Sequence, residues 1–357
     1  MSNKYIGMDV HQASTVIVVL NEAGKTIMET ILETKTGTLL DFIQGLRGRL
    51  QVTFEEGTYA AWLYDVLTPY VERVVVCDPR KNKLLPSGHK SDKVDARKLA
   101  EWLRQGQLVA VYHGNRTLRG LKELVRSYLC LVQDVTRVMN RLKALYRGRG
   151  ISCGGRAVYR LRQRDSWLAL LSEPGVQQRA ALLYQQLDVL QALRQTARQA
   201  LLTESRKQAA FPILRQIPGL GPIRAGVVLA LVQTPHRFRT KRQFWAYLGL
   251  AVVTSSSAEY RIVQGRVQKS GKPVSTRGLN PNYNRALKDV FKAAATGVSQ
   301  REGPFKTLYA RWLDRGLAPE LARLSLARKR AALTLTLWKK GARYHPEQVT
   351  QQAAQAA

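Results

Sequence analysis

The first 77 residues contain five β-rich runs in an order that restricts the fold more than any other feature of the chain. Short turns separate the first three runs, which predicts an antiparallel meander. Predicted helices precede each of the last two, which predicts parallel strands with crossover helices. The strands are expected at 4–9, 15–21, 26–33, 51–54 and 73–77, and the helices at 38–47 and 60–67. This order is that of a ribonuclease-H-like α/β sheet.

The middle of the chain predicts two long amphipathic helices. Apolar residues recur at three- and four-residue spacing over 115–148 and over 176–208. The stretch 147–166 between them is rich in Gly and Arg. We expect a helical hairpin or coiled-coil arm that dimerises or spans nucleic acid, although two helices of an ordinary bundle would give the same pattern.

The remainder of the chain is expected to be mostly helical, with a β-hairpin at about 260–267 where Ser, Gly and β-branched residues interrupt the helical period. A Gln/Ala-rich end predicts fraying. These patterns divide the chain into an α/β domain, a helical arm, a mostly α C-terminal domain and a flexible tail. The expected boundaries are 1–110, 111–208, 209–345 and 346–357.

The charge is distributed unevenly along the chain. Residues 1–105 hold 14 Lys+Arg and 13 Asp+Glu, whereas residues 106–357 hold 43 and 12. Such an excess is unfavourable unless it meets a polyanion, so nucleic acid is the expected partner and an anionic membrane surface the weaker alternative. The absence of a membrane-span or secretory pattern predicts a cytoplasmic, nucleoid-associated protein. Three Cys without a CxxC pair favour neither a disulfide framework nor a zinc ribbon.

Acidic residues at the ends of predicted elements suggest a metal site in the near-neutral segment. Asp9 ends the first predicted strand, and Glu55 and Glu56 follow the fourth. Asp92 and Asp95 lie on one face at the start of a helix. Four carboxylates from two strands and a helix would hold two divalent cations such as Mg²⁺, an arrangement used for phosphoryl transfer.

Each of these acids also has a purely structural interpretation. Ser91 or Asp92 could cap the helix, and Asp95 would be favoured in the first turn by the helix dipole. Asp9 could belong to an ordinary turn at a strand end. The order and spacing of the four acids together favour the metal site.

Two segments of the basic region could contact phosphate. The Gly-rich turn 217–222, followed by a predicted helix, is typical of a helix-hairpin-helix, although it could also be a tight turn between core helices. A Ser triplet, 255–257, precedes several basic residues. A serine hydroxyl near a metal-held phosphodiester can attack phosphorus, but Ser triplets are also ordinary loop chemistry.

Five segments in order across nearly the whole chain carry a family resemblance. They are Ile6-Gly7-Met8-Asp9-Val10, Phe54-Glu55-Glu56-Gly57, Lys90-Ser91-Asp92-Lys93-Val94-Asp95-Ala96, the turn 217–222, and the stretch from Gly249 through Ser256-Ser257 and Gly265 to Lys269. This series resembles the IS110 (IS-one-ten) family of insertion-sequence transposases. The Lys-Ser-Asp-x-x-Asp-Ala run is its most specific part.

The resemblance implies a RuvC-like domain with a DEDD tetrad and a C-terminal domain with a nucleophilic serine. Carried onto this sequence, the tetrad that binds Mg²⁺ is Asp9, Glu55, Asp92 and Asp95, with Glu56 as the alternative second acid. The serine is Ser257, with Ser256 as its alternative. The implied partners are donor and target duplex DNA, a guide RNA encoded by the element, and further copies of the chain in a dimer or tetramer, one of which supplies the serine.

We therefore expect an RNA-guided DNA recombinase of a mobile element. Two other functions fit the same residues. A RuvC-like nuclease would hydrolyse DNA with a metal-bound water, and a basic scaffold would bind RNA or DNA without chemistry. A covalent protein–DNA adduct separates the recombinase from the nuclease, and metal-dependent cleavage separates both from the scaffold.

Overall fold

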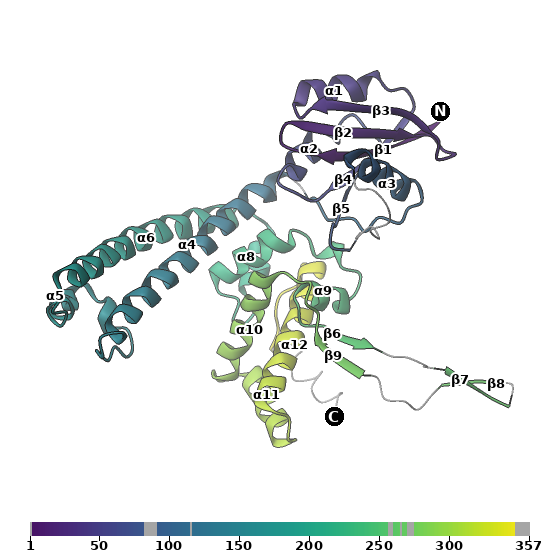
Figure 1. Ribbon diagram of the computed structural model, residues 1–357. Coiled ribbons are helices and arrows are strands. Elements are labelled where there is room, and N and C mark those ends of the chain that lie inside the picture. Colours follow the sequence, from purple (N-terminus) through teal and green to yellow (C-terminus); the bar gives the residue numbers. More distant parts are fainter. Residues whose placement is uncertain are drawn as a thin grey trace. The chain divides into compact units, whose positions relative to one another are not determined.

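A computed structural model describes residues 2–81, 91–114, 116–255, 260–264, 266–269 and 275–346. The chain divides into two compact units, Met1–Gly114 and Asn115–Ala357. Both are drawn in Figure 1. No helix in the described part of the chain combines the length and apolar character that a membrane span needs.

The first unit is a mixed α/β domain with one five-stranded sheet of order β3-β2-β1-β4-β5 (Figure 1). Its elements are β1 (Asn3–Val10), β2 (Ser14–Leu20), β3 (Thr26–Glu33), α1 (Thr36–Gly45), β4 (Arg49–Glu55), α2 (Ala60–Leu67), β5 (Arg73–Cys77) and α3 (Asp92–Arg104). Strands β1, β2 and β3 pair antiparallel, and β4 pairs parallel with β1 and β5. The predicted succession of strands and helices is confirmed.

Successive side chains of β1 point to opposite faces of the sheet, and different helices cover the two faces. Ile6 and Met8 point into the core formed with α1 and α2. The opposite face carries α3, whose small residues Ala96 and Ala100 pack against apolar residues of β2. Small side chains at this contact allow the helix to lie close to the strands.

The second unit begins with two long helices, α4 (Arg116–Arg147) and α6 (Pro174–Arg206), which lie side by side (Figure 1). Both were predicted. Their far ends share a core in which the hydroxyls of Tyr146 and Tyr184 lie 3.1 Å apart. The connection contains η1 (Ala157–Tyr159), η2 (Leu161–Gln163) and α5 (Arg164–Ala169), which the Gly- and Arg-rich composition did not predict.

The rest of the unit is mostly helical and contains the largest core of the described residues. Its elements are α7 (Ala210–Arg215), α8 (Pro222–Val232), η3 (Pro235–Arg237), α9 (Lys241–Tyr247), β6 (Val252–Ser255), β7 (Tyr260–Val263), β8 (Arg266–Lys269), β9 (Ser275–Leu279), α10 (Arg285–Ser299), α11 (Pro304–Asp314) and α12 (Pro319–Lys340). Helix α8 is buried from Ala225 to Val232. The predicted hairpin is confirmed as β7–β8, whereas the β6–β9 pair was not predicted.

Candidate metal centre

Two of the predicted acids lie at neighbouring positions on one edge of the sheet. Strands β1 and β4 are parallel, with Gly7 opposite Thr53 and Met8 opposite Phe54. Asp9 and Glu55 are the next residues of the two strands. Because side chains alternate along a strand, both acids are on the face that carries α3.

The start of α3 supplies the other two acids. Ser91 is the N-cap residue, and its hydroxyl accepts a hydrogen bond from the Val94 amide at 3.4 Å. The cap is therefore Ser91 and not Asp92. Asp92 and Asp95 both lie in the first helical turn, where the helix dipole favours a negative charge. Since α3 packs on β1 and β2, this turn brings both carboxylates to the edge where Asp9 lies.

His11 completes the closest group of ligand atoms. Its Nε2 atom lies 3.3 Å from Oδ2 of Asp9 and 3.5 Å from Oδ2 of Asp92. One potential ligand atom from each of these three residues lies within 4.8 Å of the others. His11 was not predicted as a site residue. Its position two residues after Asp9 places it near the site, but its contact with Asp92 depends on the fold.

The carboxylates influence one another electrostatically. Burial raises the pKa of Asp9, and the charges of Asp92 and Asp95 raise it further, while His11 opposes the rise. Burial likewise raises the pKa of Glu55, with smaller contributions from Asp9 and Asp95. All four predicted acids are thus close enough to repel. A divalent cation bound among them would relieve this repulsion.

Glu56 has a different environment from Glu55. Its Oε2 atom lies 2.6 Å from Nε2 of His113, whose ring stacks on Tyr64 with centroids 4.9 Å apart. Glu55 instead pairs in register with Cys77 of β5. Burial, together with the Glu55 charge, raises the pKa of the Cys77 thiol to about 12. Glu55 is therefore the acid that shares its surroundings with Asp9 and Asp95.

The predicted nucleophiles, Ser256 and Ser257, lie outside the described residues. Ser255 ends β6 and is opposite Ser275 of β9. The roles of the serines stay predictions.

The Gly-rich turn 217–222 lies between α7 and α8. Gly219 adopts a positive φ of 78°, and its carbonyl accepts a hydrogen bond from Arg224 at 3.0 Å. Flanking helices agree with the predicted hairpin motif. Phosphate binding by this turn stays a prediction.

Comparisons with known proteins match both units. Residues 6–148, which include all four acids, match a DEDD family of IS110 type described as transposase. Residues 212–310 match a family described as "Transposase IS116/IS110/IS902 family". The "Insertion element IS116 uncharacterized 44.8 kDa protein" of Streptomyces clavuligerus is 26% identical over 133 residues. That match covers 37% of this chain and only 29% of the relative's length.

Proposed function

Since the chain belongs to the IS116/IS110/IS902 family of transposases, we propose that it cleaves and rejoins DNA strands during movement of an insertion sequence. One observation carries the proposal: Asp9, Asp92 and their acidic neighbours converge at one edge of the sheet. The strand order β3-β2-β1-β4-β5 supports a ribonuclease-H-like, RuvC-like interpretation of this unit. Burial, together with mutual repulsion, raises the pKa of the partly buried Asp9 and of Glu55, and such clustering of carboxylates favours a functional over a structural role.

The chemistry of the donor set fits a hard divalent cation, with Mg²⁺ as the expected metal. Carboxylate oxygens are the ligands that Mg²⁺ prefers, whereas imidazole nitrogen suits softer metals. We therefore assign metal binding to Asp9, Glu55, Asp92 and Asp95, and assign to His11 the role of a polar partner that orients Asp9 and Asp92. When bound, such cations stabilise the negative charge that develops on phosphate oxygens during strand cleavage.

The proposed nucleophile is Ser257, with Ser256 as the alternative. Its Oγ atom forms a bond to the phosphorus of a DNA phosphodiester while the bond from phosphorus to the 3′ oxygen breaks. The serine proton is released, and the departing 3′ oxygen takes up a proton. The phosphoserine link retains the phosphodiester energy, so that a different 3′ hydroxyl can reverse the reaction and rejoin the strands. Family membership and the position of both serines within the second matched segment support this assignment.

The proposed active site is composite. The acids belong to the first unit, whereas the serine segment belongs by sequence to the second. We propose that a second copy of the chain supplies the serine, with the α4–α6 pair acting as a coiled-coil arm in a dimer or tetramer. The basic excess of residues 106–357 supports binding of donor and target DNA and of a guide RNA.

The test is to isolate the protein from cells that carry the complete insertion sequence, which supplies any RNA and DNA partner. The trapped protein is denatured and digested, and the peptide that carries a nucleotide is identified by mass spectrometry. We expect the adduct on Ser257 and its loss in Ser257→Ala, with Ser255→Ala as the control. An adduct on Ser256 would move the assignment by one residue.

The competing functions give different results in the same experiment. Metal-dependent cleavage without an adduct would identify a nuclease that uses water. Binding without cleavage would identify a scaffold. Recombination that survives in a variant with all three serines of 255–257 changed to Ala would exclude serine catalysis.

A further inference from the structure

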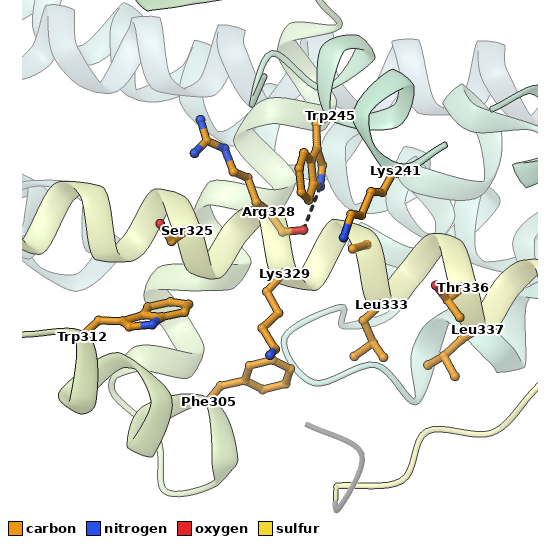
Figure 2. A pocket seen from close by; sticks show the side chains of 11 residues that line it. Lys241, Trp245, Phe305, Trp312, Ser325, Arg328, Lys329, Leu333, Thr336 and Leu337 are labelled. Atoms are coloured by element: carbon orange, nitrogen blue, oxygen red, sulfur yellow. Dashed lines mark hydrogen bonds between the residues drawn. The ribbon is translucent and has the colours of Figure 1, made fainter. Parts of the chain in front are cut away.

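A pocket of about 480 Å³ lies among α9, α11 and α12 of the second unit (Figure 2). Its walls combine three cationic side chains with three aromatic rings. The cations are Lys241, Arg328 and Lys329, and the rings are Trp245, Phe305 and Trp312. None of the described residues that line the pocket is acidic. This composition favours an anion with a flat ring as the ligand.

Hydrogen bonds to the backbone hold part of the wall in place. The indole Nε1 of Trp245 donates to the Arg328 carbonyl at 2.9 Å, as Figure 2 shows. The Nε atom of Arg328 donates to the Leu250 carbonyl at 2.6 Å, while its Nη2 atom is buried and has no hydrogen-bond partner among the described residues. The two bonds fix the side chains of Trp245 and Arg328 to the backbone, so this part of the wall is already formed.

Two of the cations lie on the same side of the pocket as aromatic rings. The Nζ atom of Lys241 lies 5.7 Å from the ring centre of Trp245. Lys329 extends from α12 toward the side of the pocket where Phe305 and Trp312 lie (Figure 2). Burial lowers the pKa of Lys329, because loss of water disfavours the charged amine. An anion beside the amine would offset that cost.

We propose that this pocket binds one unstacked nucleotide of a single strand, with the base on an aromatic ring and the phosphate beside Lys329. The volume falls within the range of about 300 to 1,000 Å³ that is typical of small-ligand pockets. Aromatic platforms combined with basic side chains are the usual means of binding single-stranded nucleic acid. The inference rests on the proposed function, which supplies two sources of such a nucleotide: the guide RNA and a DNA strand released during exchange.

The first test is photocrosslinking of the full-length protein to short single strands that carry one 5-iodouracil. An oligouridine and an oligodeoxyuridine of equal length are compared, and the crosslinked residue is mapped by mass spectrometry. We expect crosslinks to Trp245, Phe305 or Trp312. The strand type with the higher yield on these rings identifies RNA or DNA as the source.

The second test measures affinity for the same strands. Trp312→Leu should weaken binding about five- to tenfold, because a stacked base contributes about that factor or more. The matched control is Tyr309→Leu, an aromatic residue of the same helix that packs on the core but does not line the pocket.

Lys329→Met should reduce the salt dependence of single-strand binding by about 0.7 for each phosphate that the lysine neutralises. Its control is Lys292→Met, an exposed residue of α10. Unfolding midpoints establish that each variant folds.

Crosslinks confined to residues outside the pocket would overturn the proposal. Wild-type affinity in folded Trp312→Leu and Lys329→Met would overturn it too. Binding of an acidic peptide without crosslinking of either strand would assign the pocket to a protein partner. If the serine adduct is absent and crosslinks still map to the pocket, the proposed function fails and the pocket assignment stands. An adduct without pocket crosslinks gives the reverse conclusion.

Discussion

A methyl group at Gly7 would lie 2.0 Å from the carbonyl oxygen of Ala96. The backbones of β1 and α3 therefore touch at a position where only glycine fits. Two residues beyond Gly7 the strand carries Asp9. The helix carries Asp92 one turn before Ala96 and Asp95 directly before it. The close approach thus fixes the separation between acids that are more than 80 positions apart in the sequence.

Gly7→Ala should lower the free energy of unfolding by about 1 to 3 kcal/mol, because the added methyl group forces α3 away from β1. The same shift should weaken binding of divalent cations. Denaturant unfolding and calorimetric titration with Mg²⁺ measure both effects. Gly37→Ala is the control, since a methyl group there meets nothing within 4 Å and alanine favours the helix. Wild-type stability in Gly7→Ala would contradict the described packing.

A second prediction concerns the ion pair that links α5 to α6. The two oxygens of Asp188 accept hydrogen bonds from Arg164 at 2.5 and 2.6 Å, and this pairing lowers the pKa of Asp188 below its ordinary 3.8. Asp188→Asn should cost about 0.5 to 1 kcal/mol at neutral pH, since the carboxylate is half-exposed.

A lowered pKa in the folded protein gives stability that is present above pH 3.8 and is lost as the pH falls through the folded value. The difference between wild type and Asp188→Asn should therefore disappear in strong acid, as measured by thermal unfolding across the pH range. The control is Glu123→Gln, which removes an ion pair with Arg126 in which both side chains are exposed. Its stability should change little. An equal difference at every pH would show that Asp188 acts by packing alone.

A third prediction concerns a buried charge. Arg330 is fully buried, its three guanidinium nitrogens have no hydrogen-bond partner among the described residues, and it lies over the Phe305 ring at 5.1 Å. Burial lowers its pKa to about 10. Arg330→Met should raise the free energy of unfolding at pH 7 by about 1 to 3 kcal/mol, because an unpaired buried charge is costly.

The sign of the pH dependence follows from the same shift. The folded protein releases the Arg330 proton near pH 10, whereas the unfolded chain releases it only at higher pH, so wild-type stability should increase as the pH rises above 10. The difference in free energy of unfolding between Arg330→Met and the wild type should then become smaller. Denaturant unfolding at pH 7 and above pH 10 measures this change. Arg323→Met, on the exposed side of α12, should show neither effect. A loss of stability in Arg330→Met would mean that the guanidinium has a compensating interaction.

The sheet could be predicted from the sequence because each of its strands is a local pattern. The strand-end positions of Asp9 and Glu55 could be predicted for the same reason, since Asp9 ends such a pattern and Glu55 follows one. The β6–β9 pair could not be predicted, because it joins two short segments that are separated by another hairpin.

Site residues whose assignment depends on contacts with distant parts of the chain could not be predicted from the sequence either. Glu55 and Glu56 are adjacent and chemically equivalent. They are distinguished by the contact of Glu56 with His113, 57 residues away, and by the charges of Asp9 and Asp95 that act on Glu55. His11 was missed because its meaning depends on Asp92 folding back to within 3.5 Å of it. Local periodicity carries no information about such contacts.

The adjacent acids offer the most direct test of the central claim, which is that the acidic edge of the sheet holds the metal for DNA cleavage. The measurement is the rate of Mg²⁺-dependent cleavage by Glu55→Gln and by Glu56→Gln, assayed with the partners from the complete insertion sequence. We expect Glu55→Gln to lose more than about 100-fold, since even outer-shell partners of a metal contribute about 10- to 100-fold. Glu56→Gln should retain most activity, because Glu56 is paired with His113. Full activity in Glu55→Gln, or a larger loss in Glu56→Gln, would contradict the account.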